Sequence, residues 1–168
     1  MITDKVFKML ELREVRITAL GPDDAPVGNS VKLPAAISLK LGLTMDSKEL
    51  KGDSELIDIY SKVTKAEVEM ENGQFSLDAM CILMGGTISS TASTLAWDLL
   101  GSNSTPGYFK LEGRWTYVNS QAADAHIILP KVKVTQQPSF TINDASGNFG
   151  TASSKATAVR TNDPANLS

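Results

Sequence analysis

The chain has 168 residues, of which 42% are hydrophobic and 21% charged, so it can bury the core of a single domain. Sixteen lysines and arginines against nineteen aspartates and glutamates give a formal charge of −3, which argues against a general nucleic-acid binder. One cysteine and one histidine exclude an intrachain disulfide, a thiolate zinc site and a multi-histidine metal cluster.

The sequence contains no apolar run of signal-peptide length at its start and no run of about eighteen apolar residues anywhere. We therefore expect a protein that is made in the cytoplasm and has no contact with membranes.

Alternation of apolar and polar residues predicts a strand at 11–20, where Val15, Ile17 and Ala19 share one face. Residues 21–33 are interrupted by glycine and proline, which predicts a long exposed loop. Residues 34–43 again alternate and predict a second strand.

Residues 43–62 carry a dense set of charges and contain a central Lys51-Gly52-Asp53 turn. This composition predicts a long, partly extended loop that projects from the domain.

The clearest strand lies at 65–71, followed by an Asn72-Gly73 turn. Its two faces differ completely, because apolar residues alternate with charged ones. The apolar face holds Ala66, Val68 and Met70, and the charged face holds Lys65, Glu67, Glu69 and Glu71. Three carboxylates in one row repel one another, so we expect water to reach this face.

Residues 77–84 predict a short helix, with Ser76 as its N-cap and Gly85-Gly86 as its end. The helix is apolar almost all round and must be covered on most sides. We expect it to pack on the strand at 65–71 in a core formed by Ala66, Val68, Met70, Leu77, Met80, Cys81 and Met84.

Residues 87–101 are ambiguous and fit an irregular strand. Two further strands are predicted at 108–118 and 125–135, with Pro130 indicating an edge, a bulge or a strand end. The last thirty residues predict one hairpin around 144–150. The remaining segments are a 1–10 N-terminal arm and a 161–168 C-terminal tail. Together these elements predict a single mainly-β domain, a β-sandwich or partly rolled sheet with one short flanking α-helix and long projecting loops.

Candidate residues for chemistry are few. His126 stands alone in a strand-like segment, and Cys81 lies among apolar residues, where its pKa should rise. Asp23-Asp24 and the cluster at 143–148 offer oxygen ligands, but turn chemistry explains both and neither has the spacing of a calcium loop. We therefore expect no enzyme, no metal site and no cofactor.

Several segments, taken in order, resemble the major tail tube proteins of long-tailed bacteriophages. They are KLPAAISLKLGL, ELKGDSELIDIYSKV, KAEVEMENGQFSLDAMCILMGG, TPGYFKLEGRW and ADAHIILPKVKV, and the resemblance covers roughly residues 34–140. It implies a structural virion protein, made in the host cytoplasm, that self-assembles into stacked six-membered rings. The stacked rings would form a hollow phage tail tube through which the genome passes during ejection.

The resemblance also assigns roles to residues. The charged row of Lys65, Glu67, Glu69 and Glu71 would line the lumen, where a net-negative wall would repel DNA. The projecting segment would make the contacts between rings, through Lys48, Glu49, Lys51, Asp53, Glu55, Asp58 and Tyr60. The partners that it implies are other copies of this chain, the tape-measure protein, the tail terminator and the distal tail protein, with only transient, non-specific passage of DNA.

Two other interpretations remain. The chain could be a tube subunit of a secretion system, which has related architecture. Alternatively, it could be a monomeric β-sandwich module that binds carbohydrate or protein, with Trp97, Tyr108, Trp115 or Tyr117 stacking on sugar rings. Imaging at rising protein concentration separates the tube-forming interpretations from the monomeric one.

Overall fold

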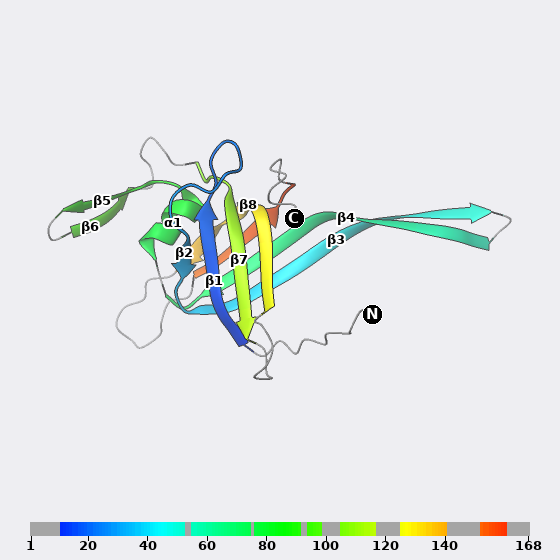
Figure 1. Ribbon diagram of the computed structural model, residues 1–168, viewed down its shortest axis with the longest axis horizontal. Coiled ribbons are helices and arrows are strands. Elements are labelled where there is room, and N and C mark those ends of the chain that lie inside the picture. Colours follow the sequence, from blue (N-terminus) through cyan, green and yellow to red (C-terminus); the bar gives the residue numbers. More distant parts are fainter. Residues whose placement is uncertain are drawn as a thin grey trace.

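The computed structural model describes residues 11–52, 55–74, 76–91, 94–98, 105–116, 125–140 and 152–160. Over these residues the fold is mainly β, as predicted, with one short helix (Figure 1). The elements are β1 (Glu11–Ala19), β2 (Val31–Leu33), β3 (Ala36–Gly52), β4 (Glu55–Asn72), α1 (Leu77–Met84), β5 (Thr87–Thr91), β6 (Thr94–Asp98), β7 (Phe109–Thr116), β8 (Ala125–Phe140) and β9 (Ala152–Ala158).

Seven strands form one antiparallel sheet in the order β2-β1-β7-β8-β9-β4-β3. The sheet turns a corner along β8, which pairs with β7 from Ala125 to Val132 and with β9 from Val132 to Phe140. Pro130 lies just before this change of partner, where its missing N–H is tolerated. The sheet is therefore partly rolled, and Figure 1 shows β1 and β7 upright in front of the oblique β3 and β4.

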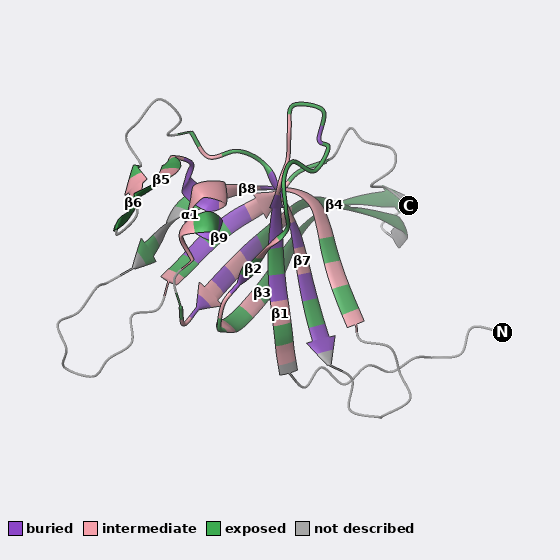
Figure 2. Ribbon diagram, turned by 60° about the vertical axis from the view of Figure 1, so that its left-hand side comes forward, coloured by how far each residue is buried: buried purple, intermediate pink, exposed green. Residues whose placement is uncertain are grey.

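The core lies between the two layers of the rolled sheet. Apolar side chains of β1 and β7 face those of β4, and Figure 2 shows the alternation of buried and exposed residues along these strands. At Gly113 the layers come so close that an added Cβ would lie 2.6 Å from Leu39 Cδ2. The most deeply buried large side chains are Phe109, Ile17, Met70, Leu111, Val15, Val68 and Val132.

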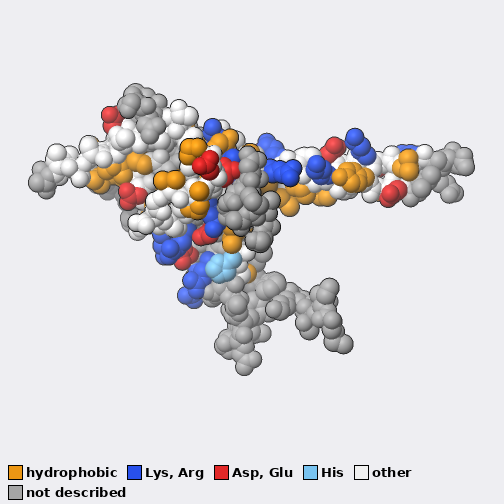
Figure 3. Space-filling view, turned by 45° about the horizontal axis from the view of Figure 1, so that its top comes forward, with side chains coloured by type: hydrophobic (Ala, Val, Ile, Leu, Met, Phe, Trp, Pro, Cys, Tyr) orange, Lys and Arg blue, Asp and Glu red, His pale blue; other side chains and the backbone are white. Residues whose placement is uncertain are grey.

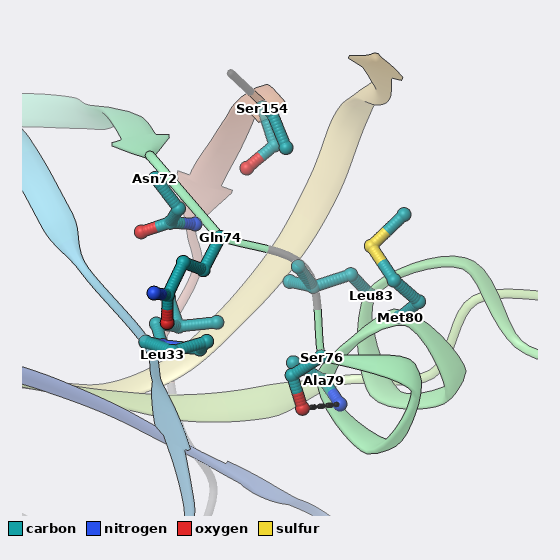
Figure 4. Close-up of a pocket in the computed structure, with 10 residues that line it drawn as sticks. Leu33, Asn72, Gln74, Ser76, Ala79, Met80, Leu83 and Ser154 are labelled. Atoms are coloured by element: carbon teal, nitrogen blue, oxygen red, sulfur yellow. Dashed lines mark hydrogen bonds between the residues drawn. The ribbon is translucent and has the colours of Figure 1, made fainter. Parts of the chain in front are cut away.

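Helix α1 begins and ends where the sequence predicts. The Ser76 hydroxyl accepts a hydrogen bond from the Ala79 N–H at 3.4 Å (Figure 4), and Gly85 ends the helix with a φ of 78°. The helix packs against β8, β1, β2 and β5, and buries Ala79, Met80, Leu83 and Met84. It covers one end of the core, over the junction of the two layers.

The loop predicted at 21–33 is shorter than expected, because its last residues form β2 and pair with β1. The rest of the loop is tied to the sheet by an ion pair between Asp24 Oδ1 and Lys131 Nζ at 2.6 Å, in which both side chains are largely buried. The Lys131 ammonium also lies 4.5 Å from the centre of the Tyr108 ring. These contacts hold the loop against β8 at its bend.

The loop predicted at 43–62 is wrong as secondary structure, because β3 and β4 continue through this region as a long antiparallel hairpin. Its dense charges suggested a loop, but an exposed two-stranded hairpin accommodates them equally well, because its described side chains are in contact with solvent. From Glu55 to Lys65, before it reaches β9, strand β4 pairs with β3 alone among the described residues. We call the resulting two-stranded projection, residues 44–52 and 55–65, the arm (Figure 1).

The ambiguous region at 87–101 forms a second hairpin, β5–β6, that is separate from the large sheet. Trp97 anchors it, because its indole N–H donates a hydrogen bond to the Gly85 carbonyl at 3.2 Å. The predicted 1–10 arm, the hairpin turn at 144–150 and the 161–168 tail lie outside the described residues.

Candidate assembly surface

Four strands form a wall with one apolar and one polar face. Along β3, β4 and β9 the register aligns Leu39 with Met70 and Ser154 on the core side, and Lys40 with Glu69 and Lys155 on the opposite side. The second half of β8 completes the wall beyond β9. The structure therefore brings Lys65, Glu67, Glu69 and Glu71 together on its polar face, with lysines from both neighbouring strands.

Ion pairs compensate two carboxylates of the row, Glu67 and Glu69. Glu69 accepts hydrogen bonds from Lys155 at 2.7 Å and from Lys40 at 3.5 Å, and Glu67 accepts one from Lys65 at 2.5 Å. Across β3, β4 and β9 this face carries three lysines, Lys40, Lys65 and Lys155, against three glutamates, so its formal charges cancel. The row at 65–71 is net negative by itself, as expected, but Lys40 and Lys155 from the neighbouring strands balance its charge.

These contacts shift the ionisation of their partners. The hydrogen bond and charge of Lys155, together with the charge of Lys40, lower the pKa of the Glu69 carboxyl. The same hydrogen bond raises the pKa of Lys155. Both groups are therefore stabilised in their charged forms. On the fourth strand of the wall, Lys133 lies opposite Thr157 and adds a further positive charge to this face.

The wall has two edges without a partner strand among the described residues. On one side β3 pairs only with β4, and on the other side β8 after Val132 pairs only with β9. Such edges present rows of backbone N–H and C=O groups that can pair with another strand. The wall therefore offers an edge at each side to a neighbouring sheet.

The arm carries most residues of the predicted inter-ring set. Lys48, Glu49, Lys51, Asp58 and Tyr60 are all exposed along it, and Lys51 forms an ion pair with Glu49 at 3.0 Å. Glu55 is the first residue of β4, and Asp53 lies outside the described residues. Figure 3 shows charged and hydrophobic side chains side by side along this projection.

The residues that were expected to form the core between the helix and the strand at 65–71 divide into two groups. Val68, Met70, Met80 and Met84 belong to one buried core cluster. The side chains of Ala66, Leu77 and Cys81 are partly exposed. Burial raises the pKa of the Cys81 thiol, and the nearby Asp78 carboxylate adds to the effect. This environment does not favour a reactive thiolate.

A charged cleft lies on the opposite part of the sheet, over β1, β7 and the start of β8. Glu14 lines this cleft, and its Oε1 atom lies 2.7 Å from Arg16 Nε and 3.9 Å from Lys32 Nζ. His126 is exposed beside it in register with Arg114, and Figure 3 shows the single histidine next to basic side chains. Within the described ranges, no three His, Cys, Asp or Glu residues are placed to hold a metal ion.

Sequence reasoning missed Lys40 and Lys155, the two lysines that flank Glu69. Lys40 was visible in the alternation of the second predicted strand, but nothing in the sequence indicated which strand it would face. Lys155 lies in the small-residue strand ASSKATA, which was treated only as part of a C-terminal hairpin.

No described helix is both long and apolar enough to span a bilayer. No protein-family model matches the sequence. No curated protein matches it either.

Proposed function

We propose that this chain is a structural subunit that assembles with copies of itself into stacked rings, which form a bacteriophage tail tube. The observation that carries the proposal is the wall of β3, β4, β9 and the second half of β8. It is polar on one face and apolar on the other, and each of its two edges lacks a partner strand among the residues that the structure describes. Neighbouring copies that pair these edges would continue the sheet from one subunit into the next.

The size of such a ring follows from the number of strands in the wall. Six copies, the number that the resemblance implies, would contribute four strands each to a barrel of about 24 strands, and barrels of about 16 to 18 strands already enclose an aqueous channel. Closure of the barrel removes the exposed edges, which would otherwise pair without control.

The polar face would then line the channel, with Lys65, Glu67, Glu69 and Glu71 on its surface. DNA is bound when cationic side chains neutralise its phosphates and release counterions. Lys40, Lys65 and Lys155 are already paired with glutamates, and Lys133 on β8 lies 5.0 Å from the centre of the Tyr108 ring, so the wall offers few cations for this exchange. Paired charges would therefore let DNA pass through the channel without being bound. The resemblance assigns this role to a net-negative wall.

The other partners come from the resemblance alone. In a virion tail, the tube would contact the tape-measure protein inside, the terminator at one end and the distal tail protein at the other. A secretion-system tube would use the same edges and the same wall, and no contact described above distinguishes the two assemblies.

The structure gives less support to a monomeric sugar-binding module. Trp115 is buried, with only 9% of its surface exposed, and the Trp97 indole is partly buried and bonded to the Gly85 carbonyl. Two lysine ammonium groups lie 4.5 and 5.0 Å from the centre of the Tyr108 ring, which is 37% exposed, and Tyr117 lies outside the described residues. Of the described rings, those of Trp97 and Trp115 are therefore too buried to stack on a sugar.

The test joins the two edges covalently. In a Cys81→Ser background, Ser38→Cys on β3 and Gln136→Cys on β8 place one thiol beside each edge, and both native residues are exposed. A short bifunctional thiol reagent should produce a ladder of covalent oligomers that ends at the hexamer. Negative-stain images and sedimentation of the unmodified chain should show rings or tubes at rising concentration, and a chain that stays monomeric in every condition contradicts the proposal.

A further inference from the structure

The strands at the two edges of the wall run in opposite directions. Neighbouring strands of the wall are antiparallel where β3 pairs with β4, β4 with β9, and β9 with β8. This alternation leaves β3 antiparallel to the second half of β8. Rotation about a channel axis keeps the direction of each strand along that axis, so β3 of the next copy in a ring meets β8 as an antiparallel partner.

The free edge of β8, which has no partner strand among the described residues, begins at a defined position. Strand β7 occupies the same side of β8 as far as Val132, the partner of Phe109. A strand of another copy can therefore pair with this side of β8 only over residues 133–140. The start of β7 thus limits how far the partner strand can extend.

Strand β9 shows how many residues a partner needs. It covers residues 133–140 of β8 with residues 152–157, from Thr157 opposite Lys133 to Ala152 opposite Phe140. Six residues are enough for eight because β8 has an extra residue at each of two bulges. A partner on the free side follows the same bulged backbone, so it also needs six consecutive residues.

The part of β3 in the wall has one regular stretch that can supply them. From Ser38 to Thr44 each residue of β3 has one partner on β4, and the register shifts just before Ser38 and just after Thr44. Six consecutive residues fit into this stretch in two ways, as 38–43 or as 39–44. In an antiparallel pair, the last of these residues lies opposite the first free residue of β8.

The two faces of the wall decide between these possibilities. Lys133 lies on the polar face, because its partner Thr157 lies opposite Glu67. Thr44 also lies on the polar face, whereas Leu43 lies on the apolar face. A sheet that continues with the same two faces therefore places Thr44, and not Leu43, opposite Lys133.

We infer that β3 of one copy pairs with the free half of β8 of the next copy with Thr44 opposite Lys133. The inference rests on the proposed function and names the register of that contact. A slip by one residue would turn the apolar side chains of β3 into the channel. A slip by two residues would carry one of the irregular ends of the stretch into the ladder.

This register gives the ring a stagger. Within one copy, the pairings place Lys133, Thr157, Glu67 and Gly42 in one row across the wall. Pairing of Lys133 with Thr44 instead of Gly42 offsets each copy from the next by two residues, the difference between positions 42 and 44. A sheet closes into a barrel only when its strands are tilted and staggered. The register therefore supplies an offset that closure needs.

Disulfide formation in the full-length chain tests the register. In a Cys81→Ser background, a Lys133→Cys protein is mixed in turn with Gly42→Cys, Thr44→Cys or Asp46→Cys and oxidised. The three positions on β3 are exposed on the polar face at two-residue intervals, so they are matched controls for one another.

Only Thr44→Cys should form the mixed disulfide-linked dimer efficiently. Directly opposite residues have Cα atoms about 4.5–5.5 Å apart, which a disulfide can bridge, whereas an offset of two residues exceeds its limit of about 7 Å. The yield should be about tenfold higher than at either other position, which corresponds to about 1.4 kcal/mol between registers. The ring test does not depend on this register, because a bifunctional reagent spans a wider gap than a disulfide.

The outcomes separate this inference from the proposed function. If the unmodified chain forms rings or tubes but another position gives the most dimer, or all three give equal amounts, the assembly stands and the register is overturned. If Thr44→Cys gives the most dimer while imaging never shows rings or tubes, the register stands and the tube is overturned. If no position gives a dimer, the inference is overturned.

An exchange of charges provides a second measurement. Thr44→Glu should lower the protein concentration needed for association by about threefold, because its carboxylate faces the ammonium of Lys133 across the contact. In a Lys133→Glu background the same substitution should raise that concentration, because two like charges then face each other. Ser38→Glu, on the same face but away from Lys133, should act equally in both backgrounds. Equal effects of Thr44→Glu in the two backgrounds would overturn the inference.

Discussion

The same two strands, β3 and β4, pass through two different environments. In the body of the domain, Val68 and Met70 are 1% and 2% exposed because β7 and β8 face them across the core. In the arm, Met45 and Val63 follow the same alternation but are 58% and 49% exposed. Alternation thus determines which side chains share a face, whereas burial depends on whether a second layer lies opposite that face.

The largest effect should come from a charge placed in the body. Met80 is 4% exposed in the core cluster, and Met80→Asp would bury an unpaired carboxylate or force it to protonate. We expect loss of folding, seen as loss of the far-ultraviolet circular dichroism of the strands and of a cooperative thermal transition. Gln74→Asp, at an exposed position just before the helix, is the control, and a soluble, cooperatively folded Met80→Asp protein would contradict the prediction.

Removal of the outer part of the arm should leave the domain folded but stop assembly, whereas Met80→Asp should prevent folding itself. Replacing residues 47–61 by Asn-Gly joins Asp46 to Lys62, which are partners in the hairpin register, through a two-residue turn. The free energy of unfolding should change by no more than about 1 kcal/mol, because the deleted side chains lie outside the core. Polymerisation should be abolished, and tubes of normal appearance in electron micrographs would show that the arm is not needed between rings.

Loss of the helix cap should have a smaller effect within the body. Ser76→Ala removes the hydroxyl that accepts the Ala79 N–H, and such a change costs about 1 kcal/mol. Urea unfolding monitored by Trp fluorescence should show a lower midpoint with an unchanged slope. Ser90→Ala, at an exposed position on β5, should leave the midpoint unchanged, and a Ser76→Ala midpoint equal to wild type would mean that the cap contributes nothing.

The smallest effect should be the pH dependence of the wall. The folded-state pKa of Glu69 lies below its unfolded value, which is about 4.3. Its contribution to stability is therefore complete above pH 4.3 and is lost as the pH falls through the folded pKa. Glu69→Gln should weaken the decline of the melting temperature on acidification, and about 1 M salt should reduce the difference between the two proteins. Identical pH profiles at low salt would show that the ion pairs with Lys40 and Lys155 do not stabilise the fold.

The sequence was sufficient to predict the features that depend on neighbours along the chain. The helix at 77–84 with its Ser76 cap, and the division of faces at 65–71, follow from local spacing and were predicted from it. The loop at 43–62 was predicted wrongly because dense charge is typical of loops, whereas here it lies on a two-stranded hairpin exposed to solvent. Lys155 was missed because 85 residues separate it from its partner Glu69, and nothing in single-sequence periodicity encodes such a pairing.

The bend in β8 has a mechanical consequence. One unbroken strand belongs to both layers, and the ion pair between Asp24 and Lys131 fastens a loop beside the point where it turns. The angle between the two layers therefore cannot change without breaking backbone pairing or a shielded ion pair. Every copy would offer its edges at one fixed angle, and a repeating assembly needs that uniformity to keep a constant curvature.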